Sequence, residues 1–427
     1  MYEVPTAHAE ATVAAAPPRR VREFRLLLTG SSVSMLGSRV SAIAYPLLVL
    51  ALTDSPVAAG WACFAATAPS VLFYLPAGAF IDRSNPRHAL LTCESLRGLA
   101  IASLVVALAV GRLTVTQLIL VAIVEEILEV FSTLAERRIA RSLVEPRDAA
   151  SALAQSEARS HIVVMLGRPV GAVLFSIGHA LPFLADALTF GVNIAVVRRI
   201  RNNRGDYSEP VENSHLLRDI GAGFDWLREH SFAGHALLRT AGTTFIFQAL
   251  VIIFLGEAYE QHLSSAEIGF VLAASGLGGV LGSAVAAKLF NTFGYSLFKK
   301  QLTIWMLIFV VLALDGGGRS IIALAIAMSI LGLTGALGNI ALDTYTIQNA
   351  AEAILGRVLS VGRLTSFAAL ALGPLLGGFL VKEFGAQVGI VVLLIAAILL
   401  RIAAPSQPPA QAKPPQSELA DIRPAAD

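Results

Sequence analysis

The segment Gly78-Ala79-Phe80-Ile81-Asp82-Arg83-Ser84-Asn85-Pro86-Arg87 decides the fold class of this chain. It separates two long apolar stretches and places one acidic and two basic side chains in a short connection. Each flanking stretch is long enough to cross the hydrocarbon core of a bilayer, which takes about 20 residues in a helix. The segment therefore indicates a short loop at one membrane face, between two transmembrane helices.

The composition of the whole chain supports a membrane protein. Hydrophobic residues make up 55% of the 427 residues and charged residues only 15%, and the mean hydropathy is +0.69. Soluble domains carry about 25% charged residues, so a soluble core could not hold this much apolar surface. A net charge of +2 is too small to indicate a nucleic-acid partner.

The sequence lacks the common signatures of enzymes and metal proteins. It contains no Walker GxxxxGK[ST] segment, no His/Cys spacing typical of metal ligands and no nucleophile elbow. Both cysteines, Cys63 and Cys93, lie inside apolar stretches, which disfavours a disulfide framework. We therefore expect a protein that is not an enzyme and needs no cofactor or metal.

Twelve apolar stretches predict an all-α integral membrane protein with twelve transmembrane helices in two pseudo-symmetric halves. The predicted helices are 25–52, 57–81, 88–110, 113–135, 156–177, 180–197, 234–255, 267–290, 298–314, 319–345, 357–381 and 385–403. The predicted organisation is an N-terminal tail (1–23), a six-helix half (24–197), a central loop (198–232), a second six-helix half (233–403) and a disordered tail (404–427). Within the central loop, 225–230 is expected to form part of an amphipathic surface helix.

Basic residues are unevenly distributed over the predicted connections. One set of connections carries Arg19, Arg20, Arg22, Arg25, Arg83, Arg87, Arg137, Arg138, Arg141, Arg147, the arginines of the central loop, Lys299 and Lys300. The opposite set carries only Arg112, Arg319 and Lys382. Because cytoplasmic loops are enriched in lysine and arginine, both termini and the central loop are predicted to be cytoplasmic. The Ala-, Arg- and Gly-rich composition favours a bacterial plasma membrane.

A glycine- and proline-rich motif occurs once in each half. Gly167-Arg168-Pro169-Val170-Gly171 in the fifth predicted helix is similar to Gly373-Pro374-Leu375-Leu376-Gly377-Gly378 in the eleventh. Gly78 and Gly282 occupy matching positions in the second and eighth. Glycine permits close helix packing and proline removes a helix hydrogen bond. The repeat predicts two related halves that move about a site between them.

The residues Gly78, Asp82, Arg83 and Arg87 resemble the cytoplasmic loop signature of the major facilitator superfamily, although Ser84-Asn85-Pro86 departs from the usual glycine. This resemblance implies that Asp82 and the arginines form a charge pair that stabilises one transport state; the alternative is that the arginines only set topology. The Gly167–Gly171 motif resembles the helix motif of antiporters in the superfamily, here interrupted by Arg168.

Further motifs narrow the resemblance to one branch of that superfamily. They are Gly37-Ser38-Arg39-Val40-Ser41, Leu181-Pro182-Phe183-Leu184-Ala185-Asp186, Gly223-Phe224-Asp225-Trp226-Leu227 and Leu355-Gly356-Arg357-Val358-Leu359-Ser360. Together they are similar to the twelve-span drug:proton antiporter branch that includes macrolide efflux pumps and the enterobactin exporter. This branch implies alternating access and proton antiport, but its members differ widely in cargo.

Charged residues inside membrane helices are costly and point to function. Glu125, Glu126 and Glu129 lie in the fourth predicted helix, and Glu125 and Glu129 share one face. Arg39 in the first helix and Glu126 both lie near the predicted bilayer midplane. A pair between Arg39 and one of these acids could couple proton binding to cargo binding. A static ion pair that joins two helices is the alternative.

Other intramembrane charges are expected to have local roles. Glu94 and Arg97 share a face of the third helix nearer the cytoplasm, where they would form an intrahelical pair or contact the Gly78–Arg87 loop. Asp186 is expected to cap a helix or form an outer gate. Arg168 and Arg159 could meet anionic cargo or acids of the fourth helix. Aromatic residues that could line a cavity, or face lipid instead, are Tyr45, Phe64, Phe73, Tyr74, Phe245, Phe247 and Trp305.

The sequence therefore predicts a monomeric secondary transporter that exports a small lipophilic molecule, such as an antibiotic, natural product or siderophore, in exchange for protons. Its partners would be the cargo, protons and the lipid bilayer. Two alternatives remain open: uptake of a metabolite by the same fold, and a sensor or partner protein that transports nothing.

Overall fold

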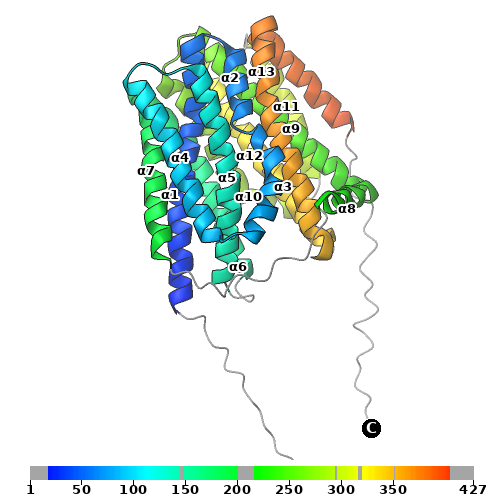
Figure 1. Cartoon of the computed structure of the whole chain (residues 1–427). Helices are drawn as coiled ribbons and strands as arrows, with labels where there is room; N and C mark the ends of the chain where they lie inside the picture. Colours follow the sequence, from blue (N-terminus) through cyan, green and yellow to red (C-terminus); the bar gives the residue numbers. More distant parts are fainter. Residues whose placement is uncertain are drawn as a thin grey trace, which may run out of the picture.

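The structure is a computed structural model that describes residues 18–144, 149–200, 216–293, 296–315, 320–350 and 352–403. These residues form thirteen helices packed side by side in one bundle (Figure 1). The helices are α1 (Pro18–Thr53), α2 (Pro56–Ala65), α3 (Ala68–Arg83), α4 (Pro86–Ala109), α5 (Val115–Leu143), α6 (Ala149–Ile177), α7 (Leu181–Arg199), α8 (Leu216–Glu229), α9 (Ser231–Glu260), α10 (Ser265–Phe293), α11 (Leu297–Leu314), α12 (Ile321–Asn349) and α13 (Glu352–Ala403). The predicted all-α membrane fold is confirmed.

The helices occupy all of the predicted spans, with two differences in where they break. The second span is divided into α2 and α3 at Ala66 and Thr67. The last two spans are two helices that meet at the non-helical residue Gly385, whose φ is 78°, and both carry the label α13. Eight helical segments within the described ranges are long and apolar enough to cross a membrane by length and composition. The tails and most of the central loop (201–215) lie outside the described residues.

The predicted amphipathic segment 225–230 lies at the end of α8, which runs across the end of the bundle (Figure 1). Trp226 and Leu227 are buried in a cluster with Phe232 and Tyr345, whereas Phe224 is 50% exposed. The two faces of this short helix are therefore different, as expected for a helix that packs on other helices at a membrane surface.

Close packing at glycines joins matching helix pairs. A β-carbon on Gly171 of α6 would lie 2.4 Å from the carbonyl oxygen of Val40 in α1. A β-carbon on Gly377 of α13 would lie 2.3 Å from the carbonyl oxygen of Ala249 in α9. Both distances are too short for any other residue, so the helices approach as closely as only glycine permits. Close packing at the repeated motif is thus confirmed.

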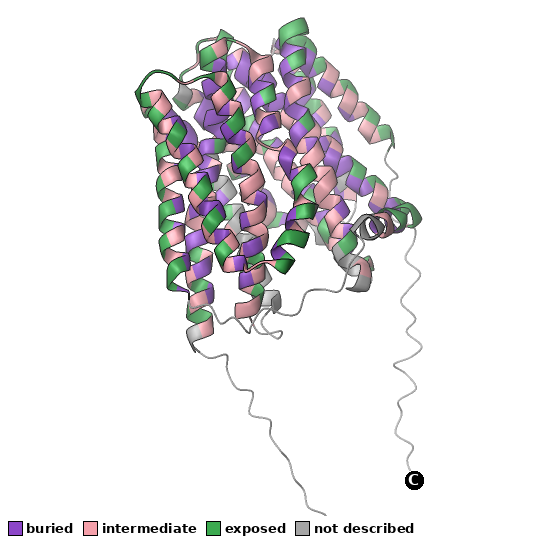
Figure 2. Ribbon diagram, viewed as in Figure 1, coloured by how far each residue is buried: buried purple, intermediate pink, exposed green. Residues whose placement is uncertain are grey.

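The core runs along the interior of the bundle, and apolar side chains also cover its outside. The main cluster of buried residues draws on α1, α2, α9 and α12, among others. Large apolar side chains such as Leu99, Leu314 and Ile322 are 69%, 83% and 70% exposed, and exposed and half-buried residues follow the outer faces of the helices (Figure 2). In a membrane protein these faces contact lipid.

Helices from the two predicted halves meet at small residues. A β-carbon on Gly60 in α2 would lie 2.7 Å from the carbonyl oxygen of Pro374 in α13, and one on Gly269 in α10 would lie 2.4 Å from Ala172 in α6. Gly378 of α13 contacts Pro56 of α2 in the same way. The division of the chain into a 24–197 half and a 233–403 half stays a prediction.

Candidate functional site

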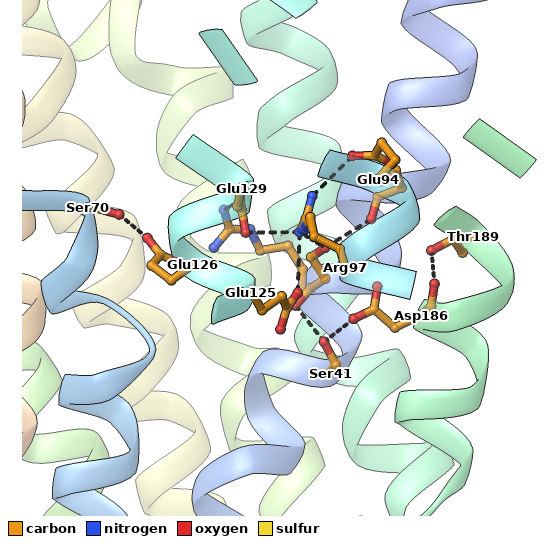
Figure 3. A network of polar contacts seen from close by, with 12 residues as sticks. Ser41, Ser70, Glu94, Arg97, Glu125, Glu126, Glu129, Asp186 and Thr189 are labelled. Atoms are coloured by element: carbon orange, nitrogen blue, oxygen red, sulfur yellow. Dashed lines mark hydrogen bonds and ion pairs between the residues drawn. The ribbon is translucent and has the colours of Figure 1, made fainter. Parts of the chain in front are cut away.

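A buried group of charged side chains lies among α1, α4, α5 and α7, and Arg97 of α4 is at its centre (Figure 3). The residue is 3% exposed, and its guanidinium lies 4.5 Å from the centre of the Phe190 ring. Burial of an arginine is tolerated only where acceptors surround its fixed array of donors. We call this set of residues, defined by the contacts below, the Arg97 cluster.

Three carboxylates surround the Arg97 guanidinium. Its Nη1 lies 3.3 Å from Oε1 of Glu94, one turn earlier on α4. Its Nη2 lies 3.3 Å from Glu125 and 3.3 Å from Glu129, both on α5, and donates to the Ser38 hydroxyl at 2.8 Å. The prediction of an intrahelical pair with Glu94 is confirmed. The alternative, contact of this pair with the Gly78–Arg87 loop, is not the arrangement observed, because Arg97 is bonded to α5 and α1.

Both carboxylate oxygens of Glu94 are in contact with hydrogen-bond donors. Its Oε2 accepts from the Ser34 hydroxyl at 2.8 Å and from the Asn193 side-chain amide at 2.9 Å, while Oε1 faces Arg97. These bonds connect α4 to α1 and α7. Through these contacts Glu94 holds the helices and the Arg97 guanidinium in place.

Arg39 is the second cation of the Arg97 cluster, and its partner is Glu129 at 3.2 Å. The predicted pairing of Arg39 with one of the three acids of this helix is confirmed. Glu126, which the midplane estimate placed nearest to Arg39, points away from the cluster instead (Figure 3). It accepts a hydrogen bond from the Ser70 hydroxyl of α3. Successive helix positions differ in direction, so Glu125 and Glu129 face Arg97 while Glu126 faces α3.

Asp186 lies on the α7 side of the cluster and is fully buried. Its Oδ2 accepts a hydrogen bond from the Ser41 hydroxyl at 2.6 Å. Its Oδ1 has no hydrogen-bond partner within the described part of the chain. The N-cap of α7 is Ala180, so the expectation that Asp186 caps this helix is wrong. Tyr45 completes the group, because its hydroxyl donates to Glu125 at 3.0 Å.

The Arg97 cluster contains more carboxyl groups than cations. Arg39 and Arg97 face Glu94, Glu125, Glu129 and Asp186, and the Glu126 carboxyl lies beside them. An uncompensated negative charge is costly away from water. The arrangement can lower that cost by holding protons on the carboxyls that lack a cation. Such a group can take up and release protons when its surroundings change.

The predicted charge pair in the Gly78–Arg87 loop has a different partner from those expected. Asp82 lies 3.8 Å from Nη1 of Arg138 on α5, and its side chain is 55% exposed. Arg83 is exposed. Arg87 donates to the carbonyl oxygens of Val197 and Arg198 at 3.3 and 2.8 Å, where it caps the end of α7.

The remaining predicted positions are the glycines and prolines of the helix motifs, and Arg168. A β-carbon on Gly78 would meet no described atom within 4 Å, so the expected close helix approach there is wrong for this structure. Pro169 and Pro374 lie inside α6 and α13 without ending either helix. Gly167 packs on Arg39 of α1, and Gly373 packs on α9. The Arg168 side chain lies outside the described residues.

Several polar residues of the site were not predicted. Ser34, Ser38 and Ser41 bond to Glu94, Arg97 and Asp186. Their spacing of four and three residues places them on one face of an apolar helix, which is a signal that the sequence contained. Glu136 of α5 was also missed; it pairs at 3.0 Å with Arg159 of α6, which agrees with the alternative that Arg159 meets an acid of the fourth predicted helix.

Comparisons with known proteins identify the fold and the family. Residues 13–424 match the family described as transmembrane secretion effector, a group of major facilitator superfamily transporters. Among curated proteins, none matches the sequence.

Solved transporter structures share the fold at low sequence identity. The nucleoside transporter NupG (D323A mutant) superimposes with a TM-score of 0.70 at 12% identity, covering 90% of this chain and 98% of that one. A bacterial homologue of the human lysosomal transporter Spinster, inward-facing and unoccupied, gives 0.70 at 12%, with coverage of 91% and 96%. A bacterial homologue of the iron transporter ferroportin, inward-facing, gives 0.69 at 15%, with coverage of 90% and 97%. At these identities the likeness concerns the fold alone.

Proposed function

The chain belongs to the transmembrane secretion effector family of major facilitator transporters, and from that premise we propose that it exports a small lipophilic molecule in exchange for protons. The cargo would be an antibiotic, a natural product or a siderophore. Alternating access of the two six-helix halves would carry the cargo across a bacterial plasma membrane.

The Arg97 cluster is the observation that carries the proton part of this proposal. Glu129 lies between two guanidiniums, whereas Asp186 is bonded to a serine hydroxyl and is fully buried. Their environments differ, and such pairs of acids are suited to different proton occupancy. We assign an ionised role to Glu129 and proton-carrying roles to Asp186, Glu125 and Glu126.

The two cations of the cluster differ in exposure, and this difference suggests how cargo binding would be coupled to proton release. Arg97 has a side-chain exposure of 4%, but the side chain of Arg39 is 38% exposed. A cargo molecule that approaches Arg39 could therefore change the charge balance at Glu129 without displacing Arg97. A proton released from a neighbouring carboxyl would restore that balance.

The test measures cargo flux and proton flux in the same proteoliposomes, with the protein purified at full length. A macrolide and the lipophilic dye ethidium serve as probes, and an internal pH dye records proton movement. Asp186→Asn and Glu125→Gln should abolish proton-coupled flux, while Glu383→Gln, an exposed acid on α13, serves as the matched control. Flux is normalised to folded protein, because a static ion pair predicts lost stability with intact coupling.

Each alternative has a distinct result in this assay. Cargo movement toward the cytoplasmic side under a proton gradient would identify uptake. The absence of flux for every probe, with a folded protein, would favour a sensor or partner protein. Retained coupling in Asp186→Asn, Glu125→Gln and Glu126→Gln would make the cluster structural.

The proposed orientation is tested separately. A single cysteine at position 205, in a protein without Cys63 and Cys93, should react with a membrane-impermeant maleimide only after the cells are opened. Labelling of intact cells would place the central loop outside and reverse the topology.

A further inference from the structure

One face of α1 carries a column of buried polar side chains. Ser31, Ser34, Ser38 and Ser41 are spaced alternately by three and four residues, and all four are buried. This spacing places them on the same face of the helix. From the first serine to the last, the helix rises about 15 Å, which is about half the thickness of the hydrocarbon core of a bilayer. Polar groups therefore continue from the Arg97 cluster toward the start of α1.

Asn193 of α7 extends this column beside Glu94. Its side-chain nitrogen donates to Glu94, as the Ser34 hydroxyl does, while its oxygen Oδ1 is buried and has no hydrogen-bond partner in the part of the chain that the structure describes. A β-carbon on Gly30 would lie 2.7 Å from this oxygen. The amide oxygen thus faces α1 one turn nearer its start than Ser34. Buried acceptors of this kind are satisfied by bound water.

Glu136 of α5 lies at the other end of the column. Its partner Arg159 also donates to the carbonyl oxygen of Leu28 on α1, at 3.3 Å. Ser31 lies beside the Glu136 carboxyl, and Glu94 is near enough for the two carboxyls to interact. The side chain of Glu136 is 18% exposed, and it lies seven residues before the end of α5, at the end of the bundle where α1 begins (Figure 1). Glu136 is therefore placed between the buried column and the membrane surface.

The Arg97 guanidinium determines the form in which a proton can move along this column. Glu94, Arg97 and Asp186 bond to successive serines of α1, so Arg97 lies between the two carboxyls (Figure 3). A fixed cation repels a free hydronium ion. A proton can still cross this level if it is held on the carboxyls around the guanidinium, because it then moves as part of a neutral carboxylic acid.

We propose that the column conducts protons between the Arg97 cluster and the end of the bundle where α1 begins. Glu94 and Glu136 carry the proton, and Asn193 positions the bound water between them. A proton that leaves Asp186 passes to Glu94, through this water to Glu136, and then to the surrounding water. Each transfer breaks one O–H bond and forms one, so the cluster loses one proton and every carrier returns to its starting state.

The inference rests on the proposed proton antiport, because it names the path by which the exchanged proton leaves. It also separates the proton from the cargo. Arg39 and Glu129 form the more exposed side of the cluster, where the cargo is proposed to approach, whereas the column runs inside the packing of α1, α4, α5 and α7. A proton can then leave without crossing the space that the cargo occupies.

The experiment follows proton uptake after a stopped-flow pH jump, with the full-length protein in phosphatidylcholine nanodiscs and no cargo present. The dye pyranine records the protons that leave a weakly buffered solution. Surface groups titrate in every variant, so the signal of the cluster is the difference between a protein and its Asp186→Asn counterpart. The amplitude of this difference measures how many protons the cluster binds, and its rate measures how fast they arrive.

Asn193→Leu and Glu136→Gln should each slow this uptake at least about tenfold, as expected for the loss of a positioned proton carrier, and leave its amplitude unchanged. Thr243→Val removes a buried hydroxyl of α9, outside the column, and should keep the wild-type rate. Asn193→Ser retains a hydroxyl and makes room for a second water, so it should recover most of the rate. Added azide, a small proton carrier, should do the same for Glu136→Gln; neither change would repair a packing defect.

Wild-type uptake rates in Asn193→Leu and Glu136→Gln would overturn the proposal and show that protons reach the cluster from its exposed side. That result would leave the proton antiport standing, because the amplitude would be intact. Slow uptake that neither Asn193→Ser nor azide corrects would also overturn it, since damaged packing then explains the loss. If the wild type and Asp186→Asn take up the same number of protons, the column and the proton-carrying role of Asp186 fail together.

Discussion

Replacement of Arg97 by glutamine tests whether the carboxyls of the Arg97 cluster are ionised. The variant removes one positive charge from a position that is 3% exposed and leaves Glu94, Glu125 and Glu129 without their shared partner. Loss of one member of a buried ion pair costs about 3–5 kcal/mol. Because the guanidinium is so little exposed, water can replace only a small part of its contribution.

This cost corresponds to a measurable shift in melting temperature. With an unfolding entropy of about 2.1 cal/mol/K per residue, a chain of this length is expected to lose about 3–6 °C. A fluorogenic maleimide can follow the transition in a Cys63→Ser background, since Cys93 is buried on α4 beside Glu94. A constant heating rate is needed, because unfolding of membrane proteins is often irreversible.

Glu125→Gln is the control for the Arg97→Gln measurement, and the melting temperature of Arg97→Gln itself can refute the reasoning. Glu125→Gln keeps an acceptor for the Tyr45 hydroxyl and should cost no more than about 1.5 kcal/mol. The double variant with Arg97→Gln should recover part of the loss, since it removes one of the carboxyls that Arg97 no longer contacts. If Arg97→Gln melts within about 1 °C of the wild type, the three carboxyls are already neutral, and the account of the cluster as an ionic group is wrong.

Two further predictions concern the loop and the glycine motif. Asp82→Asn should change the free energy of unfolding by less than about 1 kcal/mol, because the pair with Arg138 is long and exposed. The same substitution should slow transport. Wild-type initial rates of this variant in proteoliposomes would show that the pair only sets topology. Gly167→Ala should destabilise by about 1–3 kcal/mol, because the new β-carbon would lie 2.3 Å from that of Arg39. Gly78→Ala is its matched control and should be neutral or slightly stabilising, because it meets open space; equal melting temperatures for the two variants would contradict this packing.

The positions of the helices could be predicted because the bilayer requires long apolar segments, and hydropathy records them directly. The break at Ala66 and Thr67 was not predicted. Proline at position 69 was a signal, since it favours the first turn of a helix, but Pro46 and Pro76 lie inside continuous helices. The same residue type therefore has different outcomes, which depend on whether neighbouring helices satisfy the freed backbone groups.

The pairing of charges was harder to predict because it depends on helix rotation. Depth was a usable signal: Arg97 lies twelve residues before the end of α4 at Ala109, and Glu125 lies ten residues after the start of α5 at Val115. At 1.5 Å per residue, both lie at a similar distance from the short loop between these helices. Depth cannot distinguish Glu126 from Glu129, however. Their choice of partner follows from which face of α5 packs on α1 and α4.

The glycine motif and the charged cluster, which the sequence presents as separate features, meet at a single residue. Gly167 of α6 approaches Arg39 of α1 so closely that no β-carbon fits between them, and the guanidinium of the same Arg39 pairs with Glu129. Any sliding or bending of α6 must therefore displace the backbone that carries Arg39. Since Glu129 is shared between Arg39 and Arg97, movement of α6 changes the charge balance around the buried carboxyls. In the proposed transport cycle, a helix motion at the interface of α1 and α6 and a proton exchange in the cluster would then be parts of one mechanical event.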